Sequence, residues 1–199
     1  MKLSALTLFS ALFILILSSC SDSGVTESMD KYELTDVGNG IKKAQLKNAD
    51  GKVLEEGYLV NGVRQGSWIK LNPKHGYISS LQSYVNGQLY GTSLILNERL
   101  MISDRSTYAA GQLNGIKATY KHSKPQTESH YKNGLLHGRA LKFHNSSKRK
   151  ILSETDFVNG KQHGIYRYYD DKGNLTLDYK YENGEKISGG MISPTDTTK

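Results

Sequence analysis

The chain has 199 residues, of which 26 are Lys or Arg and 19 are Asp or Glu, so its formal net charge is +7. Its single Cys excludes a disulfide within the chain. The sequence also lacks a glycine-rich phosphate loop, a Cys pair with zinc-ligand spacing and a Gly-x-Ser-x-Gly nucleophile turn, which argues against the most common nucleotide, zinc and hydrolase sites.

The first 20 residues have the composition of an export signal. Lys2 is the only charged residue before Cys20, and residues 5–17 form an apolar run of 13 residues, shorter than the ~20 residues of a membrane-spanning helix. The run ends in Leu17-Ser18-Ser19-Cys20, which resembles the bacterial lipobox. The resemblance implies that residues 1–19 are a lipoprotein signal peptide and that Cys20 carries the lipid that anchors the chain in a membrane. The alternative is an ordinary signal peptide with Cys20 removed or left as a spare thiol.

Residues 20–37 comprise the lipidated Cys and a predicted flexible acidic spacer. From residue 21 to residue 36, five acidic residues stand against Lys31 alone, and the stretch is rich in Ser, Thr and Gly until Met29. This composition does not fold readily. Ser21 follows the Cys, where in Gram-negative bacteria an Asp would signal retention in the inner membrane. We therefore expect a lipid-anchored protein of the outer membrane, facing either the periplasm or the cell surface.

One four-residue motif occurs six times between residues 59 and 184. It consists of a large residue, a spacer, Asn or Ala, and Gly, and a second Gly usually follows four positions later. The Gly-to-Gly steps are 25, 24, 23, 26 and 24 residues, a regularity that indicates a repeat array. Asn-Gly is a strong hairpin signal because both residues accept positive φ. We predict an array over residues 38–188 with about twelve strands, each paired with its sequence neighbours, and a disordered tail over residues 189–199.

Two columns of large residues recur within this array. Two residues before each Asn or Ala stand Leu59, Tyr84, Tyr108, Tyr131, Phe157 and Tyr181, and eight residues before it stand Val53, Ile78, Ile102, Pro125, Ile151 and Leu175. Because the spacing is even, we expect both columns on one face of the strands. The predicted fold class is therefore all-β.

The segments 131–138 and 157–173 resemble the MORN repeat family, in the variant found in bacterial proteins described as YwqK-family antitoxin components. The resemblance covers about residues 40–188. The sequence departs from the pattern at Ala110, Asn114 and Ser188. The resemblance implies an elongated, single-layer antiparallel sheet of stacked β-hairpins, and it implies no catalytic residue.

The histidines and the basic residues give no strong indication of a site. His137 and His163 occupy the same slot of the repeat, and the other four His residues lack metal-ligand spacing. We therefore predict no metal, no cofactor and no catalytic residue. The run Lys148-Arg149-Lys150 falls at a predicted turn, where charges are usually solvated. Nucleic acid is not an expected partner of an exported chain without a recognition motif.

Tyrosine is the residue type most suited to binding, because there are 13 and several recur at one repeat position. Cross-strand aromatic pairs also stabilise a sheet by themselves, by ~0.2–1 kcal/mol each, and this structural role is the simpler explanation of the recurring column. Tyr166 and Tyr168 are better candidates for a binding surface. By strand alternation we expect them on the face opposite the apolar columns, with their rings exposed.

These observations predict a non-enzymatic lipoprotein of the cell envelope whose repeat sheet is a protein-interaction or scaffold surface for an unidentified protein. The alternative, taken from the family resemblance alone, is an antitoxin-like or immunity protein that neutralises a toxin by direct binding. An enzyme is disfavoured because single-layer sheets rarely form a water-excluding pocket. The first and last strands are exposed edges, so we also expect edge-to-edge self-association.

Overall fold

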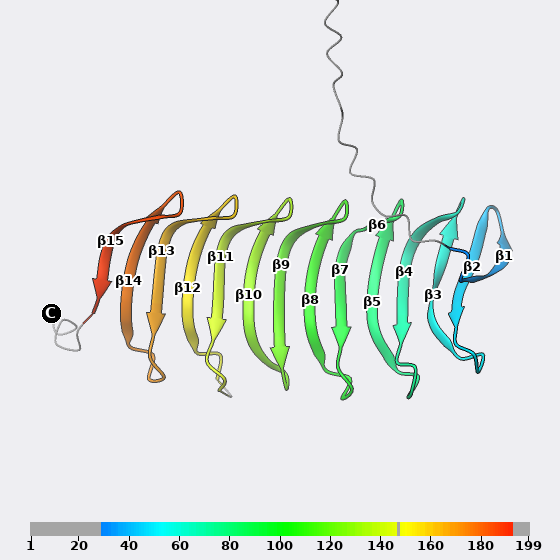
Figure 1. Ribbon diagram of the computed structural model, residues 1–199, viewed down its shortest axis with the longest axis horizontal. Coiled ribbons are helices and arrows are strands. Elements are labelled where there is room, and N and C mark those ends of the chain that lie inside the picture. Colours follow the sequence, from blue (N-terminus) through cyan, green and yellow to red (C-terminus); the bar gives the residue numbers. More distant parts are fainter. Residues whose placement is uncertain (1–28, 147, 193–199) are drawn as a thin grey trace, which may run out of the picture.

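The computed structural model describes residues 29–146 and 148–192, which form one open antiparallel sheet of 15 strands (Figure 1). The predicted all-β fold, an elongated single-layer sheet of stacked hairpins, is confirmed. The signal peptide, Cys20 and residues 193–199 lie outside the described residues. The strands are β1 (Glu33–Gly38), β2 (Ile41–Lys47), β3 (Val53–Val60), β4 (Val63–Leu71), β5 (Ile78–Val85), β6 (Gln88–Leu89), β7 (Gly91–Leu96), β8 (Ile102–Ala109), β9 (Gln112–Lys121), β10 (Lys124–Lys132), β11 (Leu135–Phe143), β12 (Ile151–Val158), β13 (Lys161–Tyr169), β14 (Leu175–Glu182) and β15 (Glu185–Met191).

The strands follow one another across the sheet in chain order, as predicted, except that the two-residue β6 pairs only with β5. The sheet has 15 strands rather than about twelve, and it extends beyond the predicted array of residues 38–188 at both ends, because β1 begins at Glu33 and β15 ends at Met191. Within the described residues, no helix is long and apolar enough to cross a membrane.

The predicted flexible spacer is wrong for its last residues. Residues 33–38 form β1, in which Asp36 lies opposite Lys42. The Lys47 ammonium lies 2.6 Å from the Glu33 carboxylate. The acidic residues that suggested disorder therefore meet basic residues of β2, which composition alone does not reveal. The predicted tail is wrong in the same way for residues 189–191, since they belong to β15 and pair with β14.

The hairpin turns at one edge of the array repeat almost without change. The Asn residues of these turns have φ between 49° and 54°, and each following Gly also has positive φ, as a two-residue type I′ turn requires. Ala110 takes the same conformation, with φ of 48°, although it lacks the tolerance of Asn. Successive turns are joined by hydrogen bonds; the Gly160 N–H, for example, donates to the Leu136 carbonyl at 2.8 Å.

The turns at the other edge share a capping side chain that the sequence reading missed. Asn48, Asn72, Asn97 and Asp170 accept hydrogen bonds from backbone N–H groups two to four residues later. Each of these four residues is placed where a strand ends and the chain reverses. Asn and Asp suit this position because their short side chains reach the backbone just ahead of them.

The two columns of large residues lie on opposite faces of the sheet, so the prediction of a shared face is wrong. In β12, Ser153 lies opposite Lys142 but Ile151 lies opposite Phe143, which leaves Leu152 bulged out of the pairing. The same shift occurs where β4 meets β5, β7 meets β8, β9 meets β10 and β13 meets β14. Even spacing preserves the face only in an uninterrupted strand. We call the face that bears Leu59, Tyr84, Tyr108, Tyr131, Phe157 and Tyr181 the tyrosine face, and the other the opposite face.

The second Gly of each repeat makes room for this aromatic column. Gly164, for example, lies directly opposite Tyr181 in the neighbouring strand and has φ of 114°. The pairs are Gly66 with Tyr84, Gly91 with Tyr108, Gly115 with Tyr131, Gly138 with Phe157, and Gly164 with Tyr181. A ring can lie over a Gly that has no side chain of its own, which protects the Gly backbone from water.

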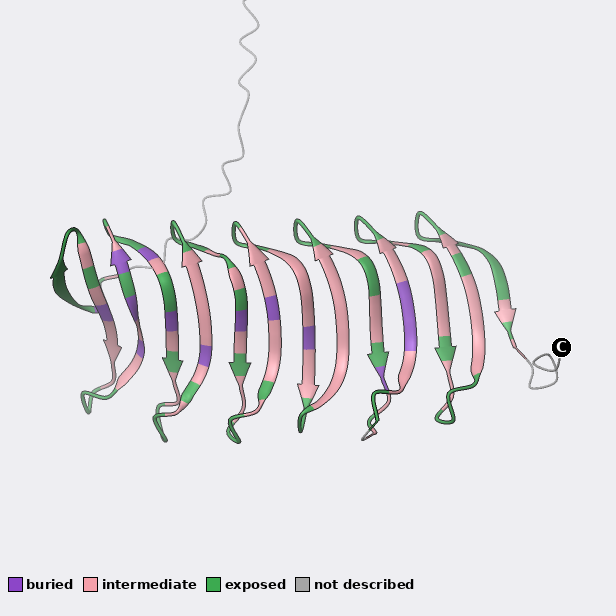
Figure 2. Cartoon of the chain, turned by 180° about the vertical axis from the view of Figure 1, so that it is seen from behind, coloured by how far each residue is buried: buried purple, intermediate pink, exposed green. Residues whose placement is uncertain are grey.

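Burial is concentrated at the N-terminal end of the sheet. The hydrophobic cluster there consists of Tyr32, Ala44, Leu59 and Trp68, with Met29 packed against it. Elsewhere along the sheet, buried positions are fewer and largely polar, such as Ser106 and the three consecutive residues 153–155 of β12 (Figure 2). The sheet is therefore stabilised mainly by strand pairing and local side-chain contacts along most of its length.

Candidate binding site on the tyrosine face

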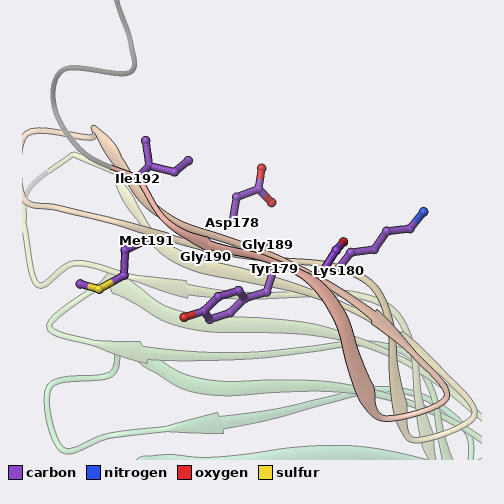
Figure 3. Close-up of a pocket in the computed structure, with 8 residues that line it drawn as sticks. Asp178, Tyr179, Lys180, Gly189, Gly190, Met191 and Ile192 are labelled. Atoms are coloured by element: carbon purple, nitrogen blue, oxygen red, sulfur yellow. The ribbon is translucent and has the colours of Figure 1, made fainter.

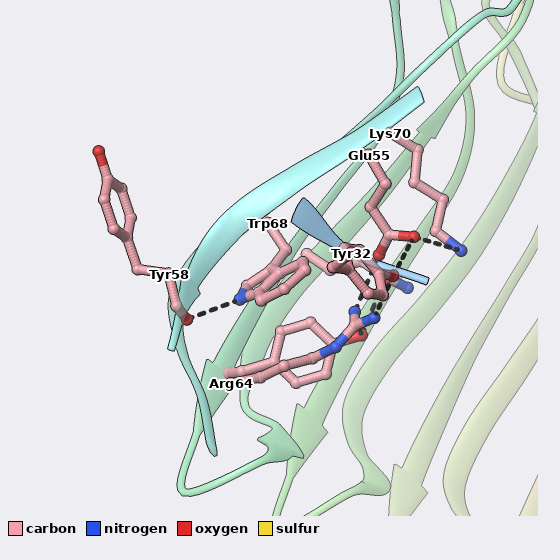
Figure 4. A network of polar contacts seen from close by, with 8 residues as sticks. Tyr32, Glu55, Tyr58, Arg64, Trp68 and Lys70 are labelled. Carbon is pink, nitrogen blue, oxygen red and sulfur yellow. Dashed lines mark hydrogen bonds and ion pairs between the residues drawn. The ribbon is translucent and has the colours of Figure 1, made fainter. Parts of the chain in front are cut away.

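The N-terminal end of the tyrosine face holds a closed aromatic cluster. Tyr32, which precedes β1, packs edge-on against Trp68, with ring centroids 5.8 Å apart, and Trp68 packs edge-on against Tyr84 at 6.2 Å. The Arg64 guanidinium lies among the three rings, with its Cζ 3.9 Å from the centroid of the Trp68 ring (Figure 4). This arrangement is a cation–π cage.

A buried carboxylate completes this cage. Glu55 is 4 % exposed, and its Oε1 lies 2.9 Å from Nη1 of Arg64. The Arg64 Nη2 donates to the Tyr32 hydroxyl at 2.8 Å, and that hydroxyl donates to Glu55 at 2.9 Å. Burial opposes the charged form of Arg64, but Glu55 and the phenolic groups of Tyr32 and Tyr84 outweigh it, so the pKa of Arg64 lies above its ordinary value. The charged and polar groups of the cage bond to one another, so we interpret the cage as a structural element rather than a binding site.

The C-terminal end of the tyrosine face repeats the aromatic pair in a more open form. Tyr166 packs edge-on against Tyr181, with centroids 6.5 Å apart, just as Trp68 packs against Tyr84. Tyr166 also stacks on Tyr179 at 6.1 Å and an interplanar angle of 14°.

Tyr166 and Tyr168, the predicted binding candidates, lie on the same face as the aromatic column and not on the opposite one. The register places Tyr166 opposite Tyr179 and Tyr168 opposite Leu177. Tyr168 is 37 % exposed, whereas Tyr166 is half-buried by its two ring neighbours. The structure adds Tyr179 to the pair, and the sequence signal that would have found it is its position two residues before Tyr181 on the same strand face.

The tyrosine face carries no charged residue over the described strands β12, β13 and β14. Its residues there are Ser153, Thr155, Phe157, Gln162, Gly164, Tyr166, Tyr168, Leu177, Tyr179 and Tyr181. The opposite face of these strands is ionic: Glu154 is 2 % exposed and pairs with Arg139 and Arg167, and Arg167 also pairs with Asp178 at 3.3 Å. The two faces of one strand group thus differ sharply in charge.

A hollow of about 410 Å³ adjoins Tyr179 at the end of the sheet. It is bordered by β14 and β15 and is lined mainly by residues of the opposite face, among them Asp178 and Lys180. Gly189, which lies opposite Tyr179, is packed against the backbone of Asp178 and Tyr179. Tyr179 and Met191 project to one side of the ribbon and Asp178 to the other (Figure 3). The Lys186 ammonium lies 4.2 Å from the centroid of the Tyr179 ring, and Lys186 lies opposite Tyr181, so β15 brings a positive charge to the tyrosine face.

The other candidate groups from the sequence have structural partners. Nδ1 of His163 accepts a hydrogen bond from the Asn183 N–H at 3.4 Å, and Nδ1 of His137 lies 3.5 Å from the Asn159 nitrogen, so both link successive turns. Arg149 pairs with Glu128 at 2.7 Å. Among the described residues, no group of three or more His, Cys, Asp or Glu side chains could hold a metal ion.

Comparison with known proteins adds no relative. No protein-family model matches the chain, and no curated protein is significantly similar to it. The resemblance to MORN repeats therefore rests on the residues of the hairpins and stays a prediction.

Proposed function

We propose that the chain is a lipid-anchored lipoprotein of the cell envelope whose repeat sheet is a non-enzymatic interaction or scaffold module. The observation that carries the proposal is the tyrosine face of β12–β14, where these strands contribute aromatic and no charged side chains. Strand pairing fixes the positions of these side chains, and the face stays open to solvent. Exposed aromatic surface of this kind is typical of interaction sites. Catalysis would instead favour a water-excluding pocket with converging titratable groups.

The distance from the proposed anchor is short. Met29, where the described chain begins, is nine residue steps after Cys20. A fully extended chain spans at most ~3.6 Å per residue, so Met29 lies within about 32 Å of a lipid-bearing Cys20. The outer membrane would thus hold the sheet close to its surface.

Anchoring is tested by fractionating cells that express the wild-type chain or Cys20→Ala. We expect the wild type in the membrane fraction and the variant in the soluble fraction, because the lipid is the proposed anchor. Equal distribution of the two chains would remove the anchor from the proposal.

The interaction role is tested by placing a photo-crosslinking amino acid at position 168 and, as a matched control, at position 58. Tyr58 is 45 % exposed but lies on the other face of the sheet, where Gln65 of β4 is its partner in the register. We expect crosslinked species that are specific to position 168. Identical patterns from the two positions would contradict an interaction site on the tyrosine face.

A further inference from the structure

We propose that Asn39, in the turn between β1 and β2, is a site of spontaneous deamidation, and that the Asn residues of the later turns are protected from this reaction. Deamidation replaces the side-chain amide of Asn by a carboxylate. This chemistry is independent of the proposed function, because it depends on the turns of the sheet alone.

The reaction requires one molecule of water and no enzyme. The backbone nitrogen of the residue after Asn gives its proton to a base and attacks Cγ of the Asn side chain. The bond from Cγ to Nδ2 breaks, ammonia leaves, and a succinimide ring remains. Water then opens this ring at either carbonyl, which yields Asp or isoaspartate. A Gly after the Asn favours the attack because it has no side chain to obstruct it.

Six turns of the sheet contain an Asn that is followed by Gly, and their local structure is nearly identical. All six Asn residues are exposed, and their φ lies between 49° and 54°. They are Asn39, Asn61, Asn86, Asn133, Asn159 and Asn183. The dipeptide sequence and the backbone conformation therefore do not distinguish one of these sites from another.

Hydrogen bonds between successive turns do distinguish them. From the third turn onward, the Gly N–H donates to the carbonyl of the residue two positions after the Gly of the preceding turn, and we call this series the turn ladder. Its bonds join Gly87 to Arg64, Gly111 to Leu89, Gly134 to Leu113, Gly160 to Leu136 and Gly184 to Gln162, at 2.8–2.9 Å. The N–H in each bond is the group that must lose its proton before the attack. Because the bond holds this proton and fixes the nitrogen, the ladder disfavours deamidation.

The turn ladder has a direction, so its first turn is left without this protection. No turn precedes Gly40, and its N–H has no hydrogen-bond acceptor among the described residues. Asn39 also lies between Gly38 and Gly40, which gives the chain freedom on both sides. Asn61 is an intermediate case. The N–H of the following Gly likewise lacks an acceptor in the described chain, but the Asn61 N–H itself donates to the Gly40 carbonyl at 3.0 Å.

The turn at Asn39 holds the segment that closes the N-terminal cage. In the described sheet β1 pairs only with β2, and Tyr32 immediately precedes β1. Isoaspartate adds a methylene group to the main chain, which a two-residue turn cannot accommodate without a change in the pairing of its strands. We therefore expect deamidation to loosen β1 and to uncover Trp68, against which Tyr32 packs.

The test incubates the full chain, solubilised from membranes, in mildly alkaline buffer and measures Asp and isoaspartate at each of these turns by mass spectrometry of proteolytic peptides. We expect Asn39 to react about fivefold faster, or more, than each Asn whose following Gly is bonded in the turn ladder, a factor that corresponds to one ordinary hydrogen bond. Asn61 should react at an intermediate rate. The same chain in urea is the matched control, because it has the same six sequences without the ladder, and there the rates should converge.

Fluorescence of Trp68, the only Trp, follows the expected loosening of β1. It should change as the wild-type chain is incubated. Asn39→Gly accepts positive φ but has no amide to lose, so its fluorescence should stay constant with time. Asn159→Gly is the matched change in a protected turn and should behave as the wild type does.

Equal rates at the six turns of the folded chain would overturn the inference, and so would a folded chain in which Asn39 does not react while the unfolded chain does. The same order of rates in urea would also overturn it, because the neighbouring sequence and not the turn ladder would then determine the rates. Constant Trp68 fluorescence in a chain deamidated at Asn39 would contradict the loosening of β1.

Discussion

At the N-terminal end of the sheet, Trp68 packs against Tyr84 and is covered by Tyr32, a residue from outside the repeats. At the C-terminal end, the equivalent pair Tyr166 and Tyr181 is joined by Tyr179, a residue of the array itself. Trp68 is consequently 1 % exposed, whereas Tyr166 stays half-buried. The same type of cross-strand aromatic pair thus forms part of a buried core at one end of the sheet and an open surface at the other.

The difference between the ends depends on what surrounds the rings rather than on the repeat itself. Gly57 lies under the Trp68 ring so closely that a Cβ there would come within 2.2 Å of it. The ion pair of Glu55 and Arg64 then fills the space beside the rings. Substitutions at single positions of a regular repeat can therefore change the packing at one end of the array without changing the rest, because each hairpin contacts only its neighbours.

The largest expected effect is on Trp68. Replacing Trp68 with Ala should lower the free energy of unfolding by about 3–5 kcal/mol, since the ring is fully buried and leaves a cavity. Tyr166→Ala, the equivalent change at the other end, should cost clearly less because its ring is already partly hydrated. Urea unfolding followed by circular dichroism measures both, and equal losses would show that the two ends are packed alike.

The next effect separates the two buried carboxylates. Glu55→Gln should lower the free energy of unfolding by about 3 kcal/mol, because Arg64 would stay buried without its counter-charge. Glu154→Gln should cost much less, since its partner Arg139 has a half-exposed side chain that water can solvate. Urea midpoints of both variants provide the comparison, and a greater loss in Glu154→Gln would reverse our assignment of the N-terminal end as the core.

The architecture was predictable because it depends on local chemistry that recurs. The Asn-Gly turns and the 23- to 26-residue steps specify hairpins that can pair only with their neighbours, and the sheet has this order. The strand faces were not predictable in the same way. A bulge such as the one at Leu152 moves Ile151 to the other face, and spacing in the sequence carries no mark of it.

The candidate site was predictable only in part for the same reason. Tyr166 and Tyr168 stand out in the sequence, but their neighbours Tyr179 and Gly189 come from other strands and become visible only through the register. The sequence did not predict the cage at Tyr32, because the polar composition of residues 20–37 indicated a flexible spacer. Met29 and Tyr32 are nevertheless large apolar or aromatic residues in that polar segment, and such residues are a signal of local burial.

The turn at Ala110 lies between the two ends of the sheet, and its stability can be raised by substitution. Ala110→Asn should raise the free energy of unfolding by about 0.5–1 kcal/mol, because Asn accepts the left-handed conformation with less strain. Asn159→Ala is the matched reverse change and should lower stability by a similar amount. Trp68 is the only Trp, so its fluorescence reports the N-terminal end. A gain seen by circular dichroism but not by Trp68 fluorescence would show that the two ends unfold separately.

The smallest effect concerns acid. Hydrogen bonds from the Gln45 amide and the Lys43 ammonium hold the pKa of Glu56 below its ordinary value of 4.5, and hydrogen bonds from Asn174 and neighbouring backbone N–H groups do the same for the pKa of Asp170, ordinarily 3.8. Both carboxylates are ionised more readily in the folded chain, so their contribution to stability is complete above the ordinary values and is lost as the pH falls through the lowered ones.

Asp170→Asn tests this at the C-terminal end, because Asn48, Asn72 and Asn97 cap the equivalent turns without a charge. The variant should lose less of its urea midpoint than the wild type between pH 7 and pH 3. Glu56→Gln should do the same at the N-terminal end, and the shifts should be small because both side chains lie near solvent. An unchanged pH dependence in both variants would contradict a contribution of Glu56 and Asp170 to the acid sensitivity of the sheet.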